Sequence, residues 1–382
     1  MFKAELKEIA DAGMMKITKV IEGRQGVEIK IAGKKYLNFC GNNYLGLAGT
    51  DVMVRVAQEG LEKYGFGMAS VRFICGTSTV HIELEQEVAK FFGFQDAILY
   101  SSCFDANTGL FETILKEGDA VFSDELNHAS IIDGIRLCKA ERFRYKHSDM
   151  TDLEKQLVEA RPRQRSLIIT DGIFSMDGET AKLAEISALA KKYGALLMVD
   201  DSHGSGTVGK TGRGSIEGVK GVDILTSTFG KALGGAGGGF TAGSHELVEY
   251  LKQRSRPYLF SNTLVPAIAH TALFVLKNFD KKFLPLKKQL AENMAYFRAG
   301  LQKLGYTVGG DGSHPITPVM FPDEITTVRT AEALYKKGIY VRGFTYPVVP
   351  KGKARIRVQL SAAHTRTHLD KALGAFRGVK LI

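Results

Sequence analysis

Short apolar segments alternate with amphipathic segments through the central part of the chain. The apolar segments have the length of β-strands and contain many β-branched residues, which are common in strands. We predict strands at 97–100, 120–123, 144–147, 166–171, 196–200, 224–227 and 239–242. Apolar positions at helical spacing lie between several of them, for example at 150–160 and 183–193. This alternation predicts an α/β fold with a mostly parallel, seven-stranded sheet covered by helices.

The pattern differs towards the two ends of the chain. Residues 1–10 mix charged and apolar positions and predict an amphipathic helix, and 27–39 predicts a hairpin at the edge of a sheet. A long helical pattern covers 266–304. After it we predict the strands of a smaller α+β unit at 317–321, 340–346 and 355–360. We therefore divide the chain into an N-terminal arm (1–45), a large domain (46–283) and a small C-terminal domain (284–382).

Composition places the chain among globular proteins. It has 382 residues, of which 44% are hydrophobic and 24% charged. The cysteines show no C-x-x-C spacing, which argues against a disulfide framework and against a zinc site; they are Cys40, Cys75, Cys103 and Cys138. No apolar run is long enough to cross a bilayer, and residues 1–10 lack the unbroken apolar core of a signal peptide. We expect a cytoplasmic protein without a membrane partner.

The net charge of +10 raises the question of a nucleic-acid partner. The basic residues are spread along the chain, and no RRM, zinc-finger or helix-turn-helix signature accompanies them. A basic surface also suits an enzyme that acts on polyanionic small molecules. We expect no nucleic-acid partner, and a basic binding protein without catalysis remains an alternative.

Polar side chains follow the ends of successive predicted strands, where an open α/β sheet places its ligand. These segments are 101–107, 127–130, 174–178, 201–203 and 228–231. The first opens a helix, whose backbone N–H groups can hold a phosphate. The last carries Lys231 between the hydroxyls of 226–228 and a glycine-rich tract at 234–239. A lysine in a pocket can lose its proton and act as a nucleophile.

Two other motifs have a competing interpretation. Residues 204–211 (G-S-G-T-V-G-K-T) match the P-loop pattern, but the glycine-rich sequence that follows lacks the helix that a P-loop requires. We interpret the match as accidental and keep a P-loop nucleotide hydrolase as a remote alternative. Asp200, Asp201 and His203 could suggest a metal, but no further cluster has ligand spacing, so we predict no metal site.

The lysine, the aspartate that ends an earlier strand and the helix start together are typical of pyridoxal 5′-phosphate (PLP) chemistry. Over almost its whole length the sequence resembles the α-oxoamine synthase family of fold-type I PLP enzymes. The motifs that carry the resemblance include N-F-C-G-N-N-Y-L-G-L (38–47), L-Y-S-S-C-F-D-A-N (99–107), D-G-I-F-S-M-D-G (171–178), V-D-D-S-H (199–203) and G-K-A-L-G-G (230–235). Residues 65–77, 127–134, 255–262 and 354–365 add to it.

The resemblance implies a role for particular residues. The residues that would bind PLP are Cys103, Phe104, His128, Ser175, Asp200, His203, Thr228, Lys231, Ser261 and Asn262. Lys231 would attach the cofactor and move the substrate's α-proton, and Asp200 would keep the pyridine nitrogen protonated. His128, which would stack on the ring, is assigned to catalysis with them. His203 would bind the phenolic oxygen of the ring, and Ser175 would line its edge.

The same resemblance implies the remaining contacts. The amides of Cys103 and Phe104, with the Thr228 hydroxyl, would bind the phosphate. Ser261 and Asn262 would reach it from a second subunit, which implies a homodimer with shared sites. Arg357 would bind the substrate carboxylate as a bidentate pair, with Asn42 and His128 nearby.

Within the family the chain looks most like the members that condense glycine with acetyl-CoA. Members that use alanine or serine, or a longer or different acyl-CoA, remain the nearest alternative. The bulky Phe66, Met68 and Phe73 lie among small residues in the loop at 65–77. We expect them to narrow the amino-acid pocket and favour glycine, unless they belong to the core.

Overall fold

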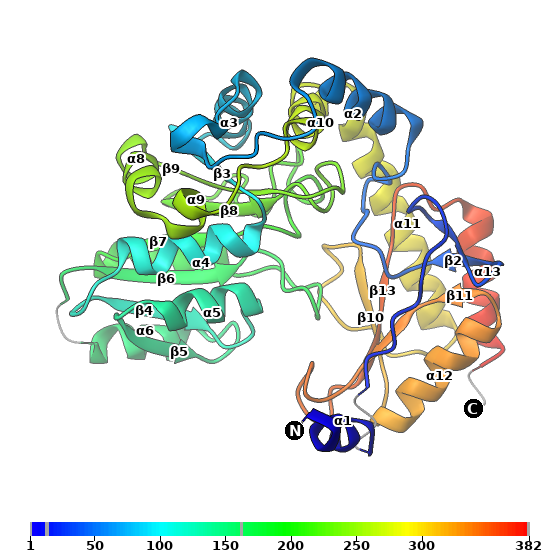
Figure 1. Cartoon of the computed structure of the whole chain (residues 1–382). Coiled ribbons are helices and arrows are strands. Elements are labelled where there is room, and N and C mark those ends of the chain that lie inside the picture. The colour runs from blue at the N-terminus through cyan, green and yellow to red at the C-terminus, as the bar shows by residue number, and fades with distance from the viewer. Residues whose placement is uncertain (1, 12–14, 161–162, 380–382) are drawn as a thin grey trace.

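The computed structural model describes residues 2–11, 15–160 and 163–379. Its largest sheet has the strand order β3-β9-β8-β7-β6-β4-β5 and lies in the cyan and green part of Figure 1. The strands are β3 (Asp96–Tyr100), β4 (Ala120–Asp124), β5 (Glu141–Tyr145), β6 (Ser166–Asp171), β7 (Leu196–Asp200), β8 (Ile224–Thr228) and β9 (Gly239–Gly243). Strands β4 to β8 are parallel, and β9 is antiparallel to β3 and β8. The predicted seven-stranded, mostly parallel sheet is confirmed.

Both faces of this sheet are buried. In β6, Leu167 and Ile169 belong to one core cluster and Ile168 to the other, and all three are completely buried. A strand that is covered on both faces has a continuous apolar run instead of an apolar–polar alternation. The central strands could be predicted from the sequence for this reason.

Helices cover both faces. One core cluster includes residues of α4 (Cys103–Ile114), α5 (Ala129–Leu137), α8 (His245–Arg254) and α9 (Arg256–Phe260). The other includes residues of α2 (Asp51–Tyr64), α3 (Thr79–Phe92), α6 (Met150–Glu159), α7 (Leu183–Tyr193) and α10 (Pro266–Lys277). A π-helical turn, η1 (Arg72–Gly76), precedes α3.

A second region lies beside the large sheet and contains two three-stranded sheets (Figure 1). One has the order β10-β13-β12, from β10 (Ile316–Met320), β13 (Arg355–Gln359) and β12 (Arg342–Phe344). The other joins the predicted hairpin, β1 (Glu28–Ile31) and β2 (Lys34–Asn38), to β11 (Ile339–Tyr340). Three helices belong to this region: α11 (Leu284–Lys303), α12 (Glu324–Lys336) and α13 (Arg366–Arg377).

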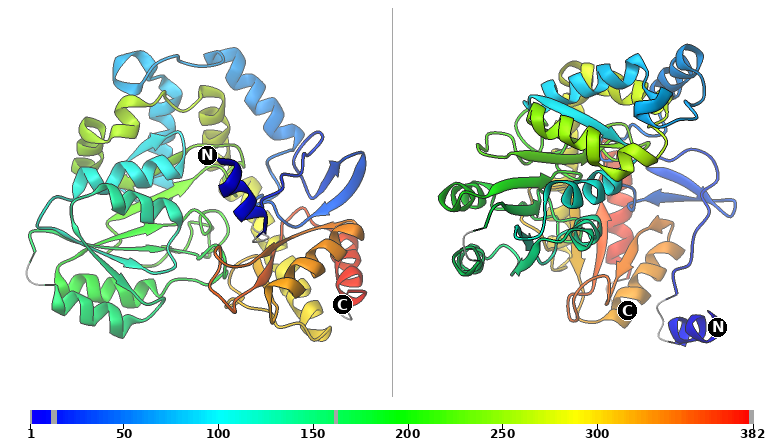
Figure 2. Two further views of the ribbon diagram at one scale, coloured as in Figure 1. Left: turned by 60° about the horizontal axis from the view of Figure 1, so that its bottom comes forward. Right: turned by 60° about the vertical axis from the view of Figure 1, so that its left-hand side comes forward.

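The predicted domain boundaries stay predictions, but one pairing bears on them. β2 runs parallel to β11, so part of the predicted arm shares a sheet with the C-terminal part of the chain. Helix α1 (Phe2–Asp11) extends away from the body in the right-hand view of Figure 2 and has no buried residue. Residues 1, 12–14 and 380–382 of the arm and the small domain lie outside the described residues.

Three predicted elements were wrong in detail. The helix at 266–304 is divided into α10, a π-helical turn η2 (Phe279–Phe283) and α11. The first turn of α11 contains Pro285, which has no N–H to donate to a preceding turn. The strand at 144–147 is β5, three residues earlier, at an exposed edge where the apolar pattern is weak. The strand at 340–346 is two short strands, β11 and β12.

None of the helices in the described part of the chain is long and apolar enough to cross a membrane.

Candidate active site

The carboxyl ends of the parallel strands bring the candidate residues to one edge of the large sheet. Asp171 ends β6, Asp200 ends β7, and the two are register partners. Asp200 is in turn paired with Thr226 of β8. Lys231 follows β8 after two further residues, and α4 begins three residues after β3. The predicted grouping of polar residues at this edge is therefore present in the fold.

Lys231 lies half-buried among these groups. Burial lowers the pKa of its ammonium, and the negative charge of Asp200 opposes that change. The charge of Lys231 in turn lowers the pKa values of His128 and His203, in both cases after the larger effect of burial. These interactions place the lysine among the predicted cofactor residues and favour its neutral, nucleophilic form.

Asp200 is buried and held through both carboxylate oxygens. Asn107 Nδ2 donates to Oδ2 at 2.7 Å, and the backbone N–H of Ser202 donates to Oδ1 at 2.9 Å. The Sγ atom of Cys103 lies 3.7 Å from Oδ2. A buried carboxylate with this many donors is fixed in orientation and suited to face a cationic partner.

His128 occupies the N-cap of α5, directly after the turn that leaves β4. Its backbone N–H donates to Oδ2 of Asp171 at 2.7 Å, and its Nδ1 lies 2.8 Å from Oγ of Ser130. Asn127, next to it, accepts from the Asp171 backbone N–H at 2.8 Å and donates to the Ile169 carbonyl oxygen at 3.0 Å. The segment 127–128 is therefore attached to the end of β6, and the imidazole is held by Ser130 at the start of α5.

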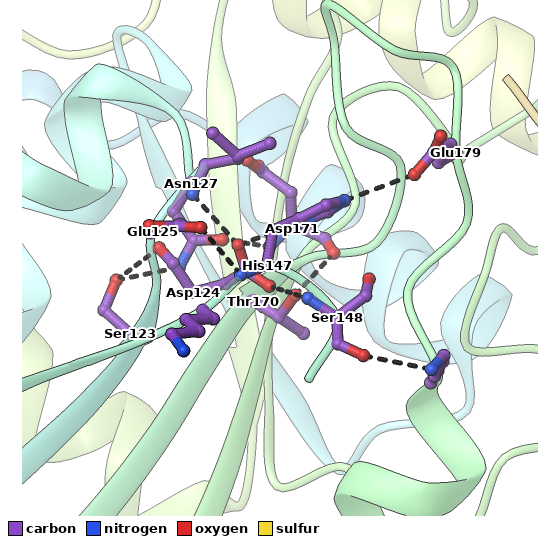
Figure 3. A network of polar contacts seen from close by, with 12 residues as sticks. Ser123, Asp124, Glu125, Asn127, His147, Ser148, Thr170, Asp171 and Glu179 are labelled. Carbon is purple, nitrogen blue, oxygen red and sulfur yellow. Dashed lines mark hydrogen bonds and ion pairs between the residues drawn. The ribbon is translucent and has the colours of Figure 1, made fainter. Parts of the chain in front are cut away.

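Figure 3 shows the network behind this turn. His147 reaches the buried Asp124 through Nδ1 at 3.0 Å and Glu179 through Nε2 at 3.2 Å. Its ring also meets Phe174 edge-on, with centroids 4.4 Å apart. Phe174 and Glu179 belong to the loop that follows β6 and carries Ser175, so His147 ties that loop to the end of β4.

His203 follows β7 and is buried. Its Nδ1 lies 2.8 Å from the hydroxyl of Tyr44, which also donates to Oε1 of Gln359 at 3.1 Å. Nε2 of His314 donates to the backbone oxygen of His203 at 2.9 Å. Burial, followed by the charge of Lys231, lowers the pKa of His203 well below its usual range, so the ring is neutral.

The start of α4 has the backbone arrangement of an anion site. The side chain of Ser102 caps the helix by accepting from the Asp105 N–H at 3.0 Å. The amides of Cys103 and Phe104 belong to the first turn, whose donors have no partner within the helix. A Cβ atom at Gly239 would overlap the amide nitrogen of Cys103, so only glycine lets β9 begin this close to the start of α4.

The other predicted phosphate residues lie close to this helix start. Thr228 Oγ1 donates to the Gly238 oxygen at 3.0 Å and accepts from the Gly230 N–H at 2.9 Å. Ser261 and Asn262 are exposed after α9. The Ser101 hydroxyl donates to the backbone oxygen of Asn262 at 3.1 Å within one chain. The predicted contribution of these two residues from a second subunit stays a prediction.

Arg357 reaches the site from β13 of the other region. Its Nη1 donates to the Ser175 oxygen at 2.8 Å, and its guanidinium lies 4.9 Å from the ring centroid of Phe344. Its buried Nε has no hydrogen-bond partner among the described residues. Asn42 Oδ1 lies 3.4 Å from the hydroxyl of Tyr44, and the hydroxyl of Tyr44 in turn lies 2.8 Å from His203 Nδ1. An unpaired buried guanidinium nitrogen is a donor that a substrate carboxylate can use.

The sequence prediction missed residues that support the site. Asn107, Tyr44 and Asp171 lie inside the family motifs, so their position was visible although their function was not. His314 lies outside those motifs, and its contact with His203 depends on the packing of the two regions against each other.

The P-loop match at 204–211 forms turns without a helix. Amides of this stretch and of the turn that follows it bind carboxylates of the same chain: the Thr211 N–H donates to Glu217 Oε1 at 2.9 Å, and the Ser215 N–H to Asp201 Oδ1 at 3.2 Å. A Cβ atom at Gly204 or Gly214 would overlap the Asp201 carboxylate. Gly204 and Gly214 are therefore explained by an internal acid.

One group in the described ranges has the composition of a metal site: Asp96, His245 and Glu249. The ammonium of Lys252 lies 2.7 Å from Glu249 and 3.8 Å from Asp96, so the cluster already contains a cation. The predicted absence of a metal site stays a prediction.

Taken together, these groups fit a PLP molecule. The helix start offers to a phosphate the amides of its first turn, which have no partner within the helix. Asp200 presents a fixed carboxylate to a protonated ring nitrogen, and Lys231 supplies an amine of lowered pKa. The unpaired Nε of Arg357 remains for the carboxylate of an amino acid.

Known proteins resemble the chain over nearly its full length. The family model for aminotransferase class I and II matches residues 34–376. A 2-amino-3-ketobutyrate coenzyme A ligase from Escherichia coli K12 is 53% identical, over 97% of this chain and 94% of the relative. An 8-amino-7-oxononanoate synthase from Thermosipho melanesiensis is 46% identical, over 99% and 97%. A serine palmitoyltransferase (SPT) solved with PLP is 31% identical with a TM-score of 0.93, over 99% of this chain and 96% of that one.

Proposed function

Because this chain belongs to the aminotransferase class I and II family, we propose that it is a PLP-dependent acyltransferase of the α-oxoamine synthase group. In this proposal it condenses glycine with acetyl-CoA to give 2-amino-3-oxobutyrate and CoA. The observation that carries the proposal is the 53% identity, over nearly the whole chain, to 2-amino-3-ketobutyrate coenzyme A ligase. The 46% identity to an 8-amino-7-oxononanoate synthase makes another member of the group the alternative.

Bound PLP supplies an electron sink for negative charge at the α-carbon of glycine. We assign three residues to this step. Lys231 would attach the cofactor. Once glycine has bound, the free amine of Lys231 would take the α-proton of glycine, and the lowered pKa of Lys231 supports this role. Asp200 keeps the ring nitrogen protonated. His128 covers the ring as a neutral imidazole, since burial lowers its pKa.

Further residues hold the cofactor and the substrate. The amides of Cys103 and Phe104, with Thr228, bind the phosphate, and Ser261 and Asn262 complete that contact from a second subunit. His203 binds the phenolic oxygen, and Ser175 lines the ring. Arg357 binds the glycine carboxylate, with Asn42 beside it. The support for Arg357 is its buried Nε, which has no partner among the described residues while Nη1 is held by Ser175.

We propose a homodimer as the active form. Large apolar side chains are exposed around the predicted phosphate residues: Phe66, Phe73, Ile74, Phe104 and Phe260. Several large apolar side chains exposed in the segments around one site are typical of an interaction surface. Phe66 is 86% and Phe73 62% exposed, so in a single chain neither belongs to the core. Both are free to meet the second subunit beside the substrate pocket.

We propose the cytoplasm as the location, because the four cysteines are unpaired thiols.

The test is a substrate panel on the purified holoenzyme. CoA release is measured with glycine, alanine or serine, each combined with acetyl-, succinyl-, pimeloyl- or palmitoyl-CoA. Glycine with acetyl-CoA should be fastest, and alanine should be disfavoured by about 10- to 200-fold, which is the effect of one misplaced methyl group. A preference for alanine, serine or a long acyl chain would assign the protein to another member of the group. A protein that is colourless and releases no CoA would contradict the proposal.

A further inference from the structure

Asn107 lies on α4 and is completely buried. Three side chains from three other elements contact its amide. Its Nδ2 donates to Asp200 Oδ2 at 2.7 Å and to Ser130 Oγ at 2.9 Å, and its Oδ1 accepts from Thr226 Oγ1 at 2.9 Å. The amide therefore uses both N–H groups and its oxygen, and it joins α4 to the end of β7, to β8 and to the start of α5.

We propose that Asn107 is the positioning residue that sets both the orientation of Asp200 and the tautomer of His128. The inference rests on the proposed function, in which both of these residues contact PLP. Asn107 itself acts only through them.

Chemistry fixes the direction of the Asn107 amide. An ionised carboxylate only accepts hydrogen bonds, so the NH₂ group, and not the oxygen, must face Asp200. The oxygen then faces Thr226, whose hydroxyl donates to it. The opposite orientation would place two acceptors 2.7 Å apart in a buried site, which is strongly unfavourable.

The direction of the Asn107 amide also determines the direction of the hydrogen bond between Ser130 and His128. Ser130 Oγ accepts from Asn107 Nδ2, so its own proton is free for Nδ1 of His128, 2.8 Å away. The backbone N–H of Ser130 also points to that Nδ1, at 3.2 Å. With two donors on Nδ1, the neutral ring carries its proton on Nε2. The Asn107 amide thereby fixes the orientation of the Asp200 carboxylate, which faces the ring nitrogen of PLP in the proposed function. It also fixes which nitrogen of the His128 ring carries the proton.

No common replacement keeps this arrangement. Alanine removes the donor from Asp200 Oδ2 and leaves a buried carboxylate oxygen short of a partner. Aspartate has the same shape but places a second negative charge against Asp200. Either change should disturb the site without removing any group that contacts the cofactor.

The test compares Asn107→Ala and Asn107→Asp with Asn293→Ala in the purified holoenzyme. Asn293 is a matched control, because it is also a buried asparagine and donates to the backbone oxygens of Ser361 and His364 at 3.0 and 2.8 Å. The readouts are the dissociation constant of PLP, the pH dependence of the visible absorption, and the ¹⁵N chemical shifts of the His128 ring.

Both Asn107 variants should bind PLP about 10- to 100-fold more weakly, as expected when a buried charged group loses a partner. They should also shift the pH profile of the absorption and mix the tautomers of His128. Asn293→Ala should lower the melting temperature and leave all three readouts unchanged. Ser130→Ala should change the His128 shifts but keep the PLP affinity within a few-fold.

Asn107 variants that lose stability as Asn293→Ala does, with wild-type affinity, pH profile and imidazole shifts, would overturn the inference. If they do not fold, Thr226→Val removes the donor to Oδ1 and should give a weaker form of the same changes; wild-type readouts there would contradict it equally. A wild-type protein that binds no PLP would contradict the proposed function instead.

Discussion

Asp171 and Asp200 lie opposite each other at the ends of neighbouring parallel strands, so two buried carboxyl groups share one edge of the sheet. Burial, followed by the negative charge of Asp200, raises the pKa of Asp171 well above its usual range. Asp171 accepts a hydrogen bond from the backbone N–H of His128. Asp200 accepts hydrogen bonds from the Asn107 side chain and the Ser202 backbone N–H. The two acids therefore have different tasks, one supporting the backbone and the other available to a charged partner.

Asp200→Asn should lower turnover by about 10³-fold or more, because it removes a main electrostatic stabiliser while hardly changing the side-chain volume. Part of the cofactor should stay bound. Asp171→Asn is the control: an amide oxygen can still accept from His128, so we expect less than about a tenfold loss. Turnover and PLP content of both variants are the measurements. Near-normal turnover in Asp200→Asn would assign the role to another residue.

Borohydride reduction of the holoenzyme should fix a pyridoxyl label on one peptide, the one that contains Lys231. Lys231 has the lowered pKa that this attachment requires, since burial disfavours its charged form. Peptide mapping by mass spectrometry is the measurement. Lys231→Ala should abolish the label, and Lys210→Ala, a change in the exposed P-loop-like turn, should keep it. A label on Lys210 would refute the assignment.

Arg357→Lys should raise the KM for glycine by about 10- to 100-fold, because lysine cannot form the bidentate pair with a carboxylate. The value of kcat should change less, since the lost contact serves binding. Arg355, two residues earlier on β13, is the control. It is already paired with Asp177, so Arg355→Lys should lower the free energy of unfolding, and it should raise the KM for glycine less than Arg357→Lys does. Equal KM changes in the two variants would argue against Arg357 as the carboxylate site.

The His147 contacts predict a pH-dependent contribution to stability. Burial opposes the charge on His147, but the hydrogen bonds and charges of Asp124 and Glu179 outweigh it and raise the pKa. The folded protein thus holds the proton more tightly than the unfolded chain does. The contribution is fully present below the unfolded pKa of about 6.5 and is lost as the pH rises through the folded pKa.

His147→Gln should therefore destabilise the protein more at pH 6 than at pH 9. Urea unfolding at both pH values measures the free energies of unfolding. Glu125 accepts the His147 backbone N–H and Lys182 donates to the Ser148 oxygen, and both contacts remain possible in the variant. His245→Gln, which removes an exposed ring paired with Asp96, should show little destabilisation at either pH. Equal destabilisation by His147→Gln at both pH values would disprove the charged clamp.

Shared active sites predict complementation between two inactive chains. One chain carries Lys231→Ala and the other Ser261→Ala with Asn262→Ala. If Ser261 and Asn262 serve the partner's site, each mixed dimer contains one intact site, and random mixing should restore about a quarter of the wild-type activity. Activity after co-expression is the measurement. No recovery, with mixed dimers present, would mean that these residues serve their own chain.

The sequence was sufficient for the large sheet because its inner strands are buried on both faces. A run such as Leu167–Ile169 is apolar at every position and ends in a polar residue at the sheet edge, so both the strand and its functional end can be recognised. The family motifs then gave the residues expected around the cofactor. The bounds of edge strand β5 could not be recognised in this way, because its exposed positions carry charged residues.

The supporting residues depend on contacts that sequence spacing does not contain. Asn107 meets Thr226 across 119 positions, and His314 meets the backbone of His203 across 111. The pairing of β2 with β11 likewise joins segments from opposite ends of the chain. Such contacts follow from how the finished layers pack, so residue type and local pattern alone do not predict them.

The turn at 204–218 has a consequence for how nucleotide-binding proteins are recognised from pattern searches. Its glycines and amides imitate a phosphate cradle, but the anions they surround are the carboxylates of Asp201 and Glu217, supplied by the protein itself. A pattern search could reject this class of false match by excluding sequences in which an acidic residue follows the threonine by a few positions and no helical pattern follows the motif. The spacing of Glu217, six residues after Thr211, is the feature such a filter would read.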